Sequence, residues 1–178
     1  MRLFAERSSE AVTVAEIASG ASMSAAAVYY HYASKDDILL EGLGEFGKAL
    51  TAQIRRQQRK IRQGDLTLTR IPAELLLWTE GNRDAATVYF TGSAGLTLPI
   101  GSLRRELRAE QVTLLTQSAR HARPGLNVCE AAVIGVAILS LVDTSAAAWL
   151  SEDQALKLLG RDEFLAETTR VASRILGE

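Results

Sequence analysis

The sequence contains a single cysteine, Cys129, among its 178 residues. One thiol cannot form a disulfide within the chain, and it excludes a metal site built from several thiolates. The chain also has only three prolines and two histidines, and neither histidine is spaced from Cys129 as in known metal sites. Glycine-serine-rich linkers, low-complexity tracts and internal repeats are missing too. We therefore expect a helix-rich chain with no cofactor and no metal.

Patterns that carry catalysis are also missing. The sequence has no glycine-rich phosphate loop, no paired-carboxylate motif and no serine–histidine–aspartate order. Cys129 lies in an apolar stretch, which predicts a buried and unreactive thiol. We expect no catalytic residue and no enzyme activity. An enzyme on a helical scaffold is the alternative, and measured turnover of a bound compound would be needed to establish it.

An excess of positive charge is absent. The formal net charge is −1, and the first 46 residues hold three cationic against seven acidic side chains, a net of −4. The cations are Arg2, Arg7 and Lys35, and the acids are Glu6, Glu10, Glu16, Asp36, Asp37, Glu41 and Glu45. Because neutralisation of phosphates supplies most non-specific affinity for DNA, this composition argues for weak DNA binding.

Only one long stretch is nearly free of charge. Residues 131–151 are interrupted by Asp143 and are rich in small side chains. The stretch is long enough for a membrane span, but no cationic anchors flank it, and we expect a buried helix instead. The first residues, Met1 to Glu6, are too charged for a signal peptide, so we expect a cytoplasmic location.

The stretch from Thr13 to Lys35 has the pattern of two short helices joined by a tight turn. Thr13 with Glu16 three residues later is typical of a capping box, and Ser24 is a suitable cap for a second helix. Gly20, Ser22 and Ser24 give the chain room to turn. Apolar residues recur at helical spacing in both segments. The pattern predicts a helix-turn-helix, whose second helix can enter the major groove of DNA.

Four fragments cover about the first quarter of the chain: RLFAER at 2–7, TVAEIA at 13–18, YYHY at 29–32 and SK at 34–35. In this order and spacing they resemble the N-terminal domain of TetR-type transcriptional regulators. The resemblance implies an all-α fold with a three-helix DNA-binding domain at 1–46. A helical ligand-binding and dimerisation domain would occupy 47–178. The family's first helix normally begins earlier than Arg2, often behind a basic arm, so we expect a truncated first helix here.

The resemblance also implies which side chains contact DNA. Four residues match positions that approach bases, namely Ser24, Ala25, Ala26 and Tyr29. Four others match positions near phosphates, namely Thr13, Tyr30, His31 and Lys35. The second helix has no Arg, Lys, Asn or Gln to form a bidentate contact with a base. Alternatively, its tyrosines serve only to pack the domain.

Beyond Lys35, the helices are read from periodicity, caps and breaks. The predicted segments are 35–62, 66–79, 83–94, 102–121, 127–150, a short helix from Ser151 to Gly160, and a last helix capped near Asp162. Residues 97–101 are expected to form a loop. The cations Arg55, Arg56, Arg59, Lys60 and Arg62 suit a solvated helix end better than a nucleic-acid patch.

A pocket for a small-molecule effector is expected among the later helices. Its candidate residues combine aromatic side chains with one acid, and they are Trp78, Tyr89, Phe90, Asp143 and Trp149. An acid within an apolar helix needs a partner, which could be an arginine, a hydroxyl or a cationic ligand group. Ordinary core packing is the alternative for each aromatic residue.

A homodimer is expected through the last two long helices. Residues 131–142 are apolar nearly all round, and the last helix has a clean apolar stripe. The predicted interface residues are Ala131, Gly135, Ile138, Val142, Phe164, Thr168, Val171 and Ile175. Two helices from each subunit would then form a two-fold four-helix interface.

The sequence therefore predicts a ligand-responsive transcriptional regulator, expected to act as a repressor. It would bind operator DNA as a homodimer and be released by a small-molecule effector. The alternative is a helical sensor or scaffold dimer whose acidic head binds DNA weakly or not at all.

Overall fold

The computed structural model describes residues 1–92, 98–151, 156 and 159–177, and these residues contain helices and no strand. The α-helices are α1 (Arg2–Glu6), α2 (Val14–Gly20), α3 (Ala25–His31), α4 (Lys35–Gln63), α5 (Ile71–Glu80), α6 (Arg83–Thr91), α7 (Leu98–Ala122), α8 (Val128–Leu150) and α9 (Arg161–Leu176). Two 3₁₀ turns, η1 (Ser9–Ala11) and η2 (Leu68–Arg70), precede α2 and α5. The predicted all-α fold is confirmed.

Side-chain caps begin the helices where the sequence predicts them. The Thr13 hydroxyl accepts from the backbone N–H of Glu16 at 3.3 Å, and the Glu16 carboxylate accepts from the backbone N–H of Thr13 at 2.9 Å. Ser34 caps α4 by accepting from the backbone N–H of Asp37, and Asn127 forms a second capping box with Glu130 at the start of α8. Each cap satisfies N–H groups that have no partner within the helix, which is why these boundaries can be read from sequence.

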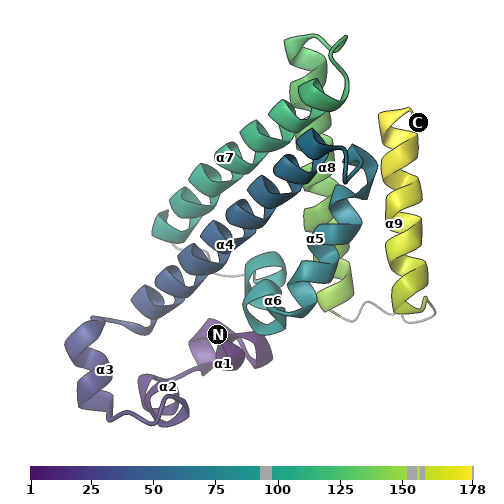
Figure 1. The fold of residues 1–178 in the computed structure, drawn as a ribbon. Coiled ribbons are helices and arrows are strands. Elements are labelled where there is room, and N and C mark those ends of the chain that lie inside the picture. The colour runs from purple at the N-terminus through teal and green to yellow at the C-terminus, as the bar shows by residue number, and fades with distance from the viewer. Residues whose placement is uncertain (93–97, 152–155, 157–158, 178) are drawn as a thin grey trace.

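Helix α4 is the long axis of the molecule, and α7 runs beside it in the same direction (Figure 1). The apolar face of α4 is buried, and it comprises Leu39, Leu43, Phe46, Leu50, Ile54 and Ile61. Gly47 allows the close approach, because a Cβ there would lie 2.3 Å from the Leu107 side chain of α7. At its end, Gly64 adopts a left-handed conformation with φ of 81°.

Helix α8 lies in the centre of the C-terminal part and contacts α5, α6, α7 and α9. By length and composition it is the one described helix apolar enough to cross a membrane. Its buried residues include Leu139, Val142 and Ala146, which belong to the same core as the α4 face. Such packing is typical of the central helix of a globular fold, as the sequence predicts.

Several predicted boundaries were wrong. Leu98 to Gly101 begin α7 instead of forming a loop, so Ser102 lies within the helix and is not its cap. The helix expected at 66–79 begins at Ile71 instead. Pro72 lies in its first turn, where the missing N–H of proline costs nothing. Gly160, not Asp162, precedes α9 as its cap residue. Most of the short helix expected from Ser151 to Gly160 lies outside the described residues.

The three N-terminal helices lie at one end of α4, and α2 and α3 are farthest from α9 (Figure 1). Helix α2 contacts α3, whereas α1 contacts α6. The buried side chains of this end include Val12, Ala18 and Val28. The N-terminal part is thus tied to the larger helical body through α1 and through the continuous helix α4.

Candidate functional site

The turn between α2 and α3 is shaped by Ser22. Its φ of 56° makes it the one described non-glycine residue with a left-handed backbone. The N–H of Met23 donates to the carbonyl of Ala18 at 2.8 Å, and that of Ser22 donates to Ser19 at 3.1 Å. These two bonds form a Schellman motif, in which glycine usually occupies the left-handed position. Gly20, which the sequence suggested for the turn, is the last residue of α2.

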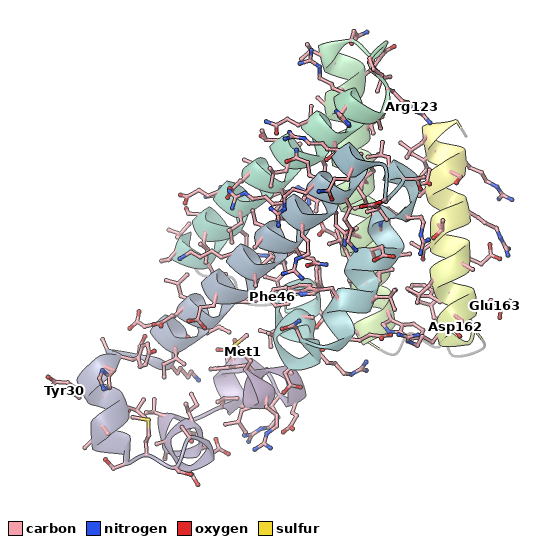
Figure 2. The ribbon with its side chains drawn as sticks, in the orientation of Figure 1. Met1, Tyr30, Phe46, Arg123, Asp162 and Glu163 are labelled. Atoms are coloured by element: carbon pink, nitrogen blue, oxygen red, sulfur yellow. The ribbon has the colours of Figure 1, made fainter. Side chains whose placement is uncertain are left out.

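The outer face of α3 is open to solvent. Ala25 and Ala26 are exposed at its first turn, and Tyr29 and Tyr30 are 59% and 86% exposed. Figure 2 shows Tyr30 projecting away from the rest of the molecule. The His31 ring packs edge-on against Tyr30 with centroids 5.0 Å apart. Such a short, protruding and accessible helix has the shape that enters a major groove.

Two predicted DNA-contacting hydroxyls also hold the local fold. Thr13 forms the capping box of α2, and its hydroxyl donates to the Glu16 carboxylate at 2.8 Å. Ser24 caps α3 by accepting from the backbone N–H of Ala27 at 3.1 Å. Both residues are exposed at helix N-termini, so each lies beside backbone N–H groups that can face a phosphate.

Lys35, which the resemblance implied to lie near a phosphate, is held by the backbone of its own chain. Its ammonium donates to the backbone carbonyls of Ser9 at 2.6 Å, Glu10 at 3.1 Å and Val12 at 3.0 Å. An ammonium has three N–H donors, and three carbonyls occupy them. The side chain therefore joins the 3₁₀ turn η1 to the start of α4, which leaves it poorly suited to bind a phosphate.

The charged side chains around α2 stabilise the local fold and leave little positive charge to attract DNA. A hydrogen bond from Arg7, together with the Thr13 backbone and side chain, lowers the pKa of Glu16 to about 2. The Arg7–Glu16 contact measures 2.9 Å between Nη1 and Oε1. Arg7 is thereby neutralised locally, and α3 contains no lysine or arginine. Contacts to phosphate from this surface must come mainly from hydroxyls, His31 and backbone N–H groups.

A small cavity of about 200 Å³ opens between α6, α7 and α8. Its lining combines two aromatic rings with four polar side chains, namely Tyr89, Phe90, Arg104, Arg108, Gln111 and Asp143. The aromatic wall continues into Phe46 of α4, whose ring lies 5.0 Å from Tyr89 between centroids. The cavity therefore has one apolar side and one strongly polar side.

The polar side of this cavity is organised by α7. Arg108 forms an ion pair with Asp143 and donates to the Ser140 hydroxyl at 3.1 Å. Arg104 donates to the backbone carbonyl of Tyr89, and its guanidinium lies 4.9 Å from the centroid of the Tyr89 ring. Burial raises the pKa of Asp143, while Arg108 and then Arg104 oppose that rise.

Three of the five residues predicted for the effector pocket line this cavity: Tyr89, Phe90 and Asp143. Trp78 is not part of the lining, although its ring lies 5.4 Å from Phe46. Trp149 stacks on Phe164 of α9 at 4.9 Å and is also outside the lining. The partner that Asp143 required is Arg108. Sequence reasoning missed Arg104, Arg108 and Gln111, whose spacing of i, i+4 and i+7 on one helix face is a readable signal.

Six of the eight predicted interface residues are covered by the chain itself. They are Ala131, Gly135, Ile138, Val142, Phe164 and Thr168, each buried within the monomer core or between its helices. Gly135 does permit a close helix approach, but the neighbour is Thr116 of α7, whose Oγ1 would lie 2.7 Å from a Cβ at this position. These side chains are therefore covered within the chain itself, and a dimer interface through α8 and α9 stays a prediction.

Other apolar side chains of α8 and α9 are exposed instead. Val171 and Ile175 are 39% and 51% exposed on α9, as predicted for a surface stripe, and Val133 is 67% exposed on α8. Val128 and Val136 of α8 are exposed as well. Cys129 is exposed too, so the prediction of a buried thiol was wrong. It lies in the first turn of α8, where the core does not reach.

The comparison with protein families agrees with the helix-turn-helix geometry. Residues 1–41 match the family described as bacterial regulatory proteins, tetR family. No significant match was found among curated proteins or among solved structures. The matched segment contains α1, α2, α3 and the start of α4, which are the elements that present the exposed helix. The N-terminal segment is therefore similar to the corresponding part of bacterial regulatory proteins of the tetR family.

Proposed function

We propose that the chain is a ligand-responsive repressor that binds operator DNA as a homodimer. The observation that carries the proposal is the exposed face of α3 within a segment that matches the tetR family. In this proposal, residues 1–46 are the DNA-binding domain and 47–178 sense the ligand and dimerise. The protein acts on DNA in the cytoplasm, and the proposal includes no enzyme activity.

The proposed DNA contacts follow the exposure of the α3 side chains. Ala25, Ala26 and Tyr29 would approach base edges, where alanine methyls can contact thymine methyls. Tyr30 and His31 would contact phosphates, and the helix starts at Thr13 and Ser24 would add backbone N–H donors. Lys35 is left out of the proposed contact set because three backbone carbonyls occupy its ammonium.

The proposed effector site is the cavity between α6, α7 and α8. Helix α6 contributes Tyr89 and Phe90 to it and also contacts α1 and α4. A ligand that moves α6 would therefore change the position of the N-terminal helices. Two recognition helices in a dimer must lie about one DNA turn apart, so a change of that spacing lowers operator affinity.

The proposed subunit contact uses the exposed apolar side chains of α8 and α9. Val133 of α8 with Val171 and Ile175 of α9 are exposed, and the two helices contact each other. Covering such side chains with a second copy of the same surface gives a closed two-fold dimer.

Fluorescence anisotropy with labelled DNA from upstream of the chain's own coding sequence tests the function. The matched variants are Ala25→Glu on α3 and Ala52→Glu on the exposed side of α4. We expect Ala25→Glu to weaken binding at least tenfold, because it adds a charge that repels phosphate. An acid in the first turn of a helix favours the helix dipole, so this variant should stay folded. Ala52→Glu should bind like the parent chain.

The acidic N-terminal segment supports a second candidate function. Its net charge of −4 favours a helical sensor or scaffold dimer whose head binds DNA weakly or not at all. The same titration separates the two candidates. Binding that weakens with added salt supports the repressor, whereas no salt-sensitive binding to any upstream duplex supports the sensor or scaffold.

A further inference from the structure

The cavity between α6, α7 and α8 carries more positive than negative charge. Arg104 and Arg108 line it from α7, and Asp143 from α8 is the one acid among its lining residues. One carboxylate opposite two guanidinium groups leaves a formal charge of +1. A pocket with this charge balance attracts an anion more strongly than a cation.

Arg108 can bind a further anion while it keeps its contacts with α8. Its two terminal nitrogens contact Asp143 and Ser140, both on α8. A guanidinium has five N–H donors in a planar fork, so these contacts leave donor capacity. The Arg108 side chain is 43% exposed and that of Asp143 is 36% exposed, which means that a ligand can reach the pair.

Arg104 stands one helical turn before Arg108 and is held in place by Tyr89. Its guanidinium donates to the Tyr89 carbonyl and lies over the Tyr89 ring. The same ring is 5% exposed and packs against Phe90 at 5.1 Å between centroids. An anion between the two arginines would therefore have an aromatic surface directly beside it.

The size and floor of the cavity limit the ligand further. Its volume of about 200 Å³ is below the range of about 300–1,000 Å³ that holds drug-sized ligands. Gln111 closes one side, where its amide donates to Thr51 of α4 at 3.1 Å. A ligand here must be small, with an apolar part for Tyr89 and Phe90 and a charged end for the arginines.

We propose that the cavity binds a small carboxylate with an apolar body, anchored by Arg104 and Arg108 and covered by Tyr89 and Phe90. The planar arginine fork matches a carboxylate in two parallel hydrogen bonds, which favours this anion over a halide. The proposal names the effector class of the cavity and so rests on the proposed function. Binding to this site bridges α6, α7 and α8.

Isothermal titration calorimetry on the full chain tests the ligand class. The probes are benzoate and phenylacetate, their neutral counterparts benzamide and phenylacetamide, and the cation benzamidine. We expect saturable binding of at least one carboxylate, at least tenfold tighter than its amide, and no measurable binding of benzamidine. Equal affinity for acid and amide would overturn the proposal, as would preferential binding of benzamidine or no binding of either carboxylate.

Three variants assign the binding to this cavity. Arg108→Gln and Arg104→Gln should each weaken carboxylate binding at least tenfold, while Arg105→Gln should stay within twofold. Arg105 lies on the same helix, is exposed and bonds Ser102 at 2.9 Å outside the cavity, so its replacement removes the same charge elsewhere. Unchanged binding in both Arg104→Gln and Arg108→Gln would overturn the assignment.

Asp143→Asn gives a test of opposite sign that does not depend on removing an arginine. It keeps the side-chain size, removes the competing carboxylate and raises the cavity charge by one unit. We expect carboxylate affinity to increase at least threefold. If the cavity bound cations instead, the same variant would lose its affinity for benzamidine. An unchanged or reduced carboxylate affinity in folded Asp143→Asn would contradict the proposal.

The outcome is separable from that of the proposed function. Operator binding is measured by anisotropy without any carboxylate, and it can fail while benzoate still binds at the cavity. Conversely, release of DNA by a neutral compound, with no carboxylate binding, would support the regulator and reject the carboxylate site.

Discussion

Lys35 shows how one residue can match a functional motif and serve the fold. In the sequence it occupies a position implied to lie near phosphate, at the start of α4. In the structure its ammonium binds the backbone carbonyls of Ser9, Glu10 and Val12. Nothing in the local pattern reveals those partners, because they come from 23 to 26 residues earlier.

Ser22 offers a residue-scale test of the turn between α2 and α3. A left-handed conformation costs an L-residue about 1–2 kcal/mol, and glycine avoids that cost but loses more entropy on folding. We expect Ser22→Gly to raise the free energy of unfolding by about 0.5–1 kcal/mol. Urea denaturation followed by circular dichroism measures it. A destabilised variant would mean that the Ser22 side chain contributes more than its backbone costs.

Glu16 should make the stability of the N-terminal part depend on pH. Its pKa falls from the ordinary 4.5 to about 2 in the folded chain, mainly through Arg7. A carboxyl group whose pKa is lowered by folding stabilises the fold at pH values above its pKa in the unfolded chain. This stabilisation is lost as the pH falls through its pKa in the folded chain. The stability advantage over Glu16→Gln should therefore be constant above pH 4.5 and shrink towards pH 2. An advantage that is unchanged across this interval would contradict the assignment.

At the scale of elements, helix starts that are set by a capping side chain are the most predictable, and helix starts that depend on packing are the least. Thr13, Ser34 and Asn127 each begin a helix as predicted, because a cap acts within three residues. The start of α7 at Leu98 was not predicted, because it depends on packing: Ile100 is 2% exposed in the shared core. The N-terminal part of α7 is thus helical through tertiary contacts.

Gly135 tests the packing of α8 against α7. A methyl group there would lie 2.9 Å from the Thr116 backbone nitrogen and 3.0 Å from the Val112 carbonyl oxygen, neither of which can move independently. We expect Gly135→Ala to lower the free energy of unfolding by about 1–3 kcal/mol. Gly20→Ala is the control, since no atom lies within 4 Å of its added methyl group. Equal stability of the two variants would reject this close contact.

At the scale of the whole molecule, the prediction concerns assembly through α9. Ile175→Glu places a charge on the exposed apolar side chain, whereas Ala166→Glu places it nine residues earlier, on the opposite face of the same helix. We expect Ile175→Glu to raise the dimer dissociation constant at least tenfold in sedimentation velocity, with the fold retained. Ala166→Glu should sediment like the parent chain. Equal sedimentation of both variants would exclude this face from the interface.

The sequence could not show which apolar side chains are covered by another helix of the same chain and which stay exposed. The stripe on α9 and the apolar surface of α8 were visible, but a periodic pattern does not say which neighbour covers it. Phe164 is covered by Trp149 within the chain, whereas Ile175 remains exposed. The same limit applied to the cavity, where Asp143 was identified and its partner Arg108 was not.

The sequence by itself determined the helical fold, the helix-turn-helix, the caps and the buried face of α4, because these depend on interactions between residues a few positions apart. Only the tertiary structure decided the role of Lys35, the ion pair of Asp143, the coverage of α8 and the exposure of Cys129. These features join segments that are distant in the chain, and their pairing is set by how whole helices pack.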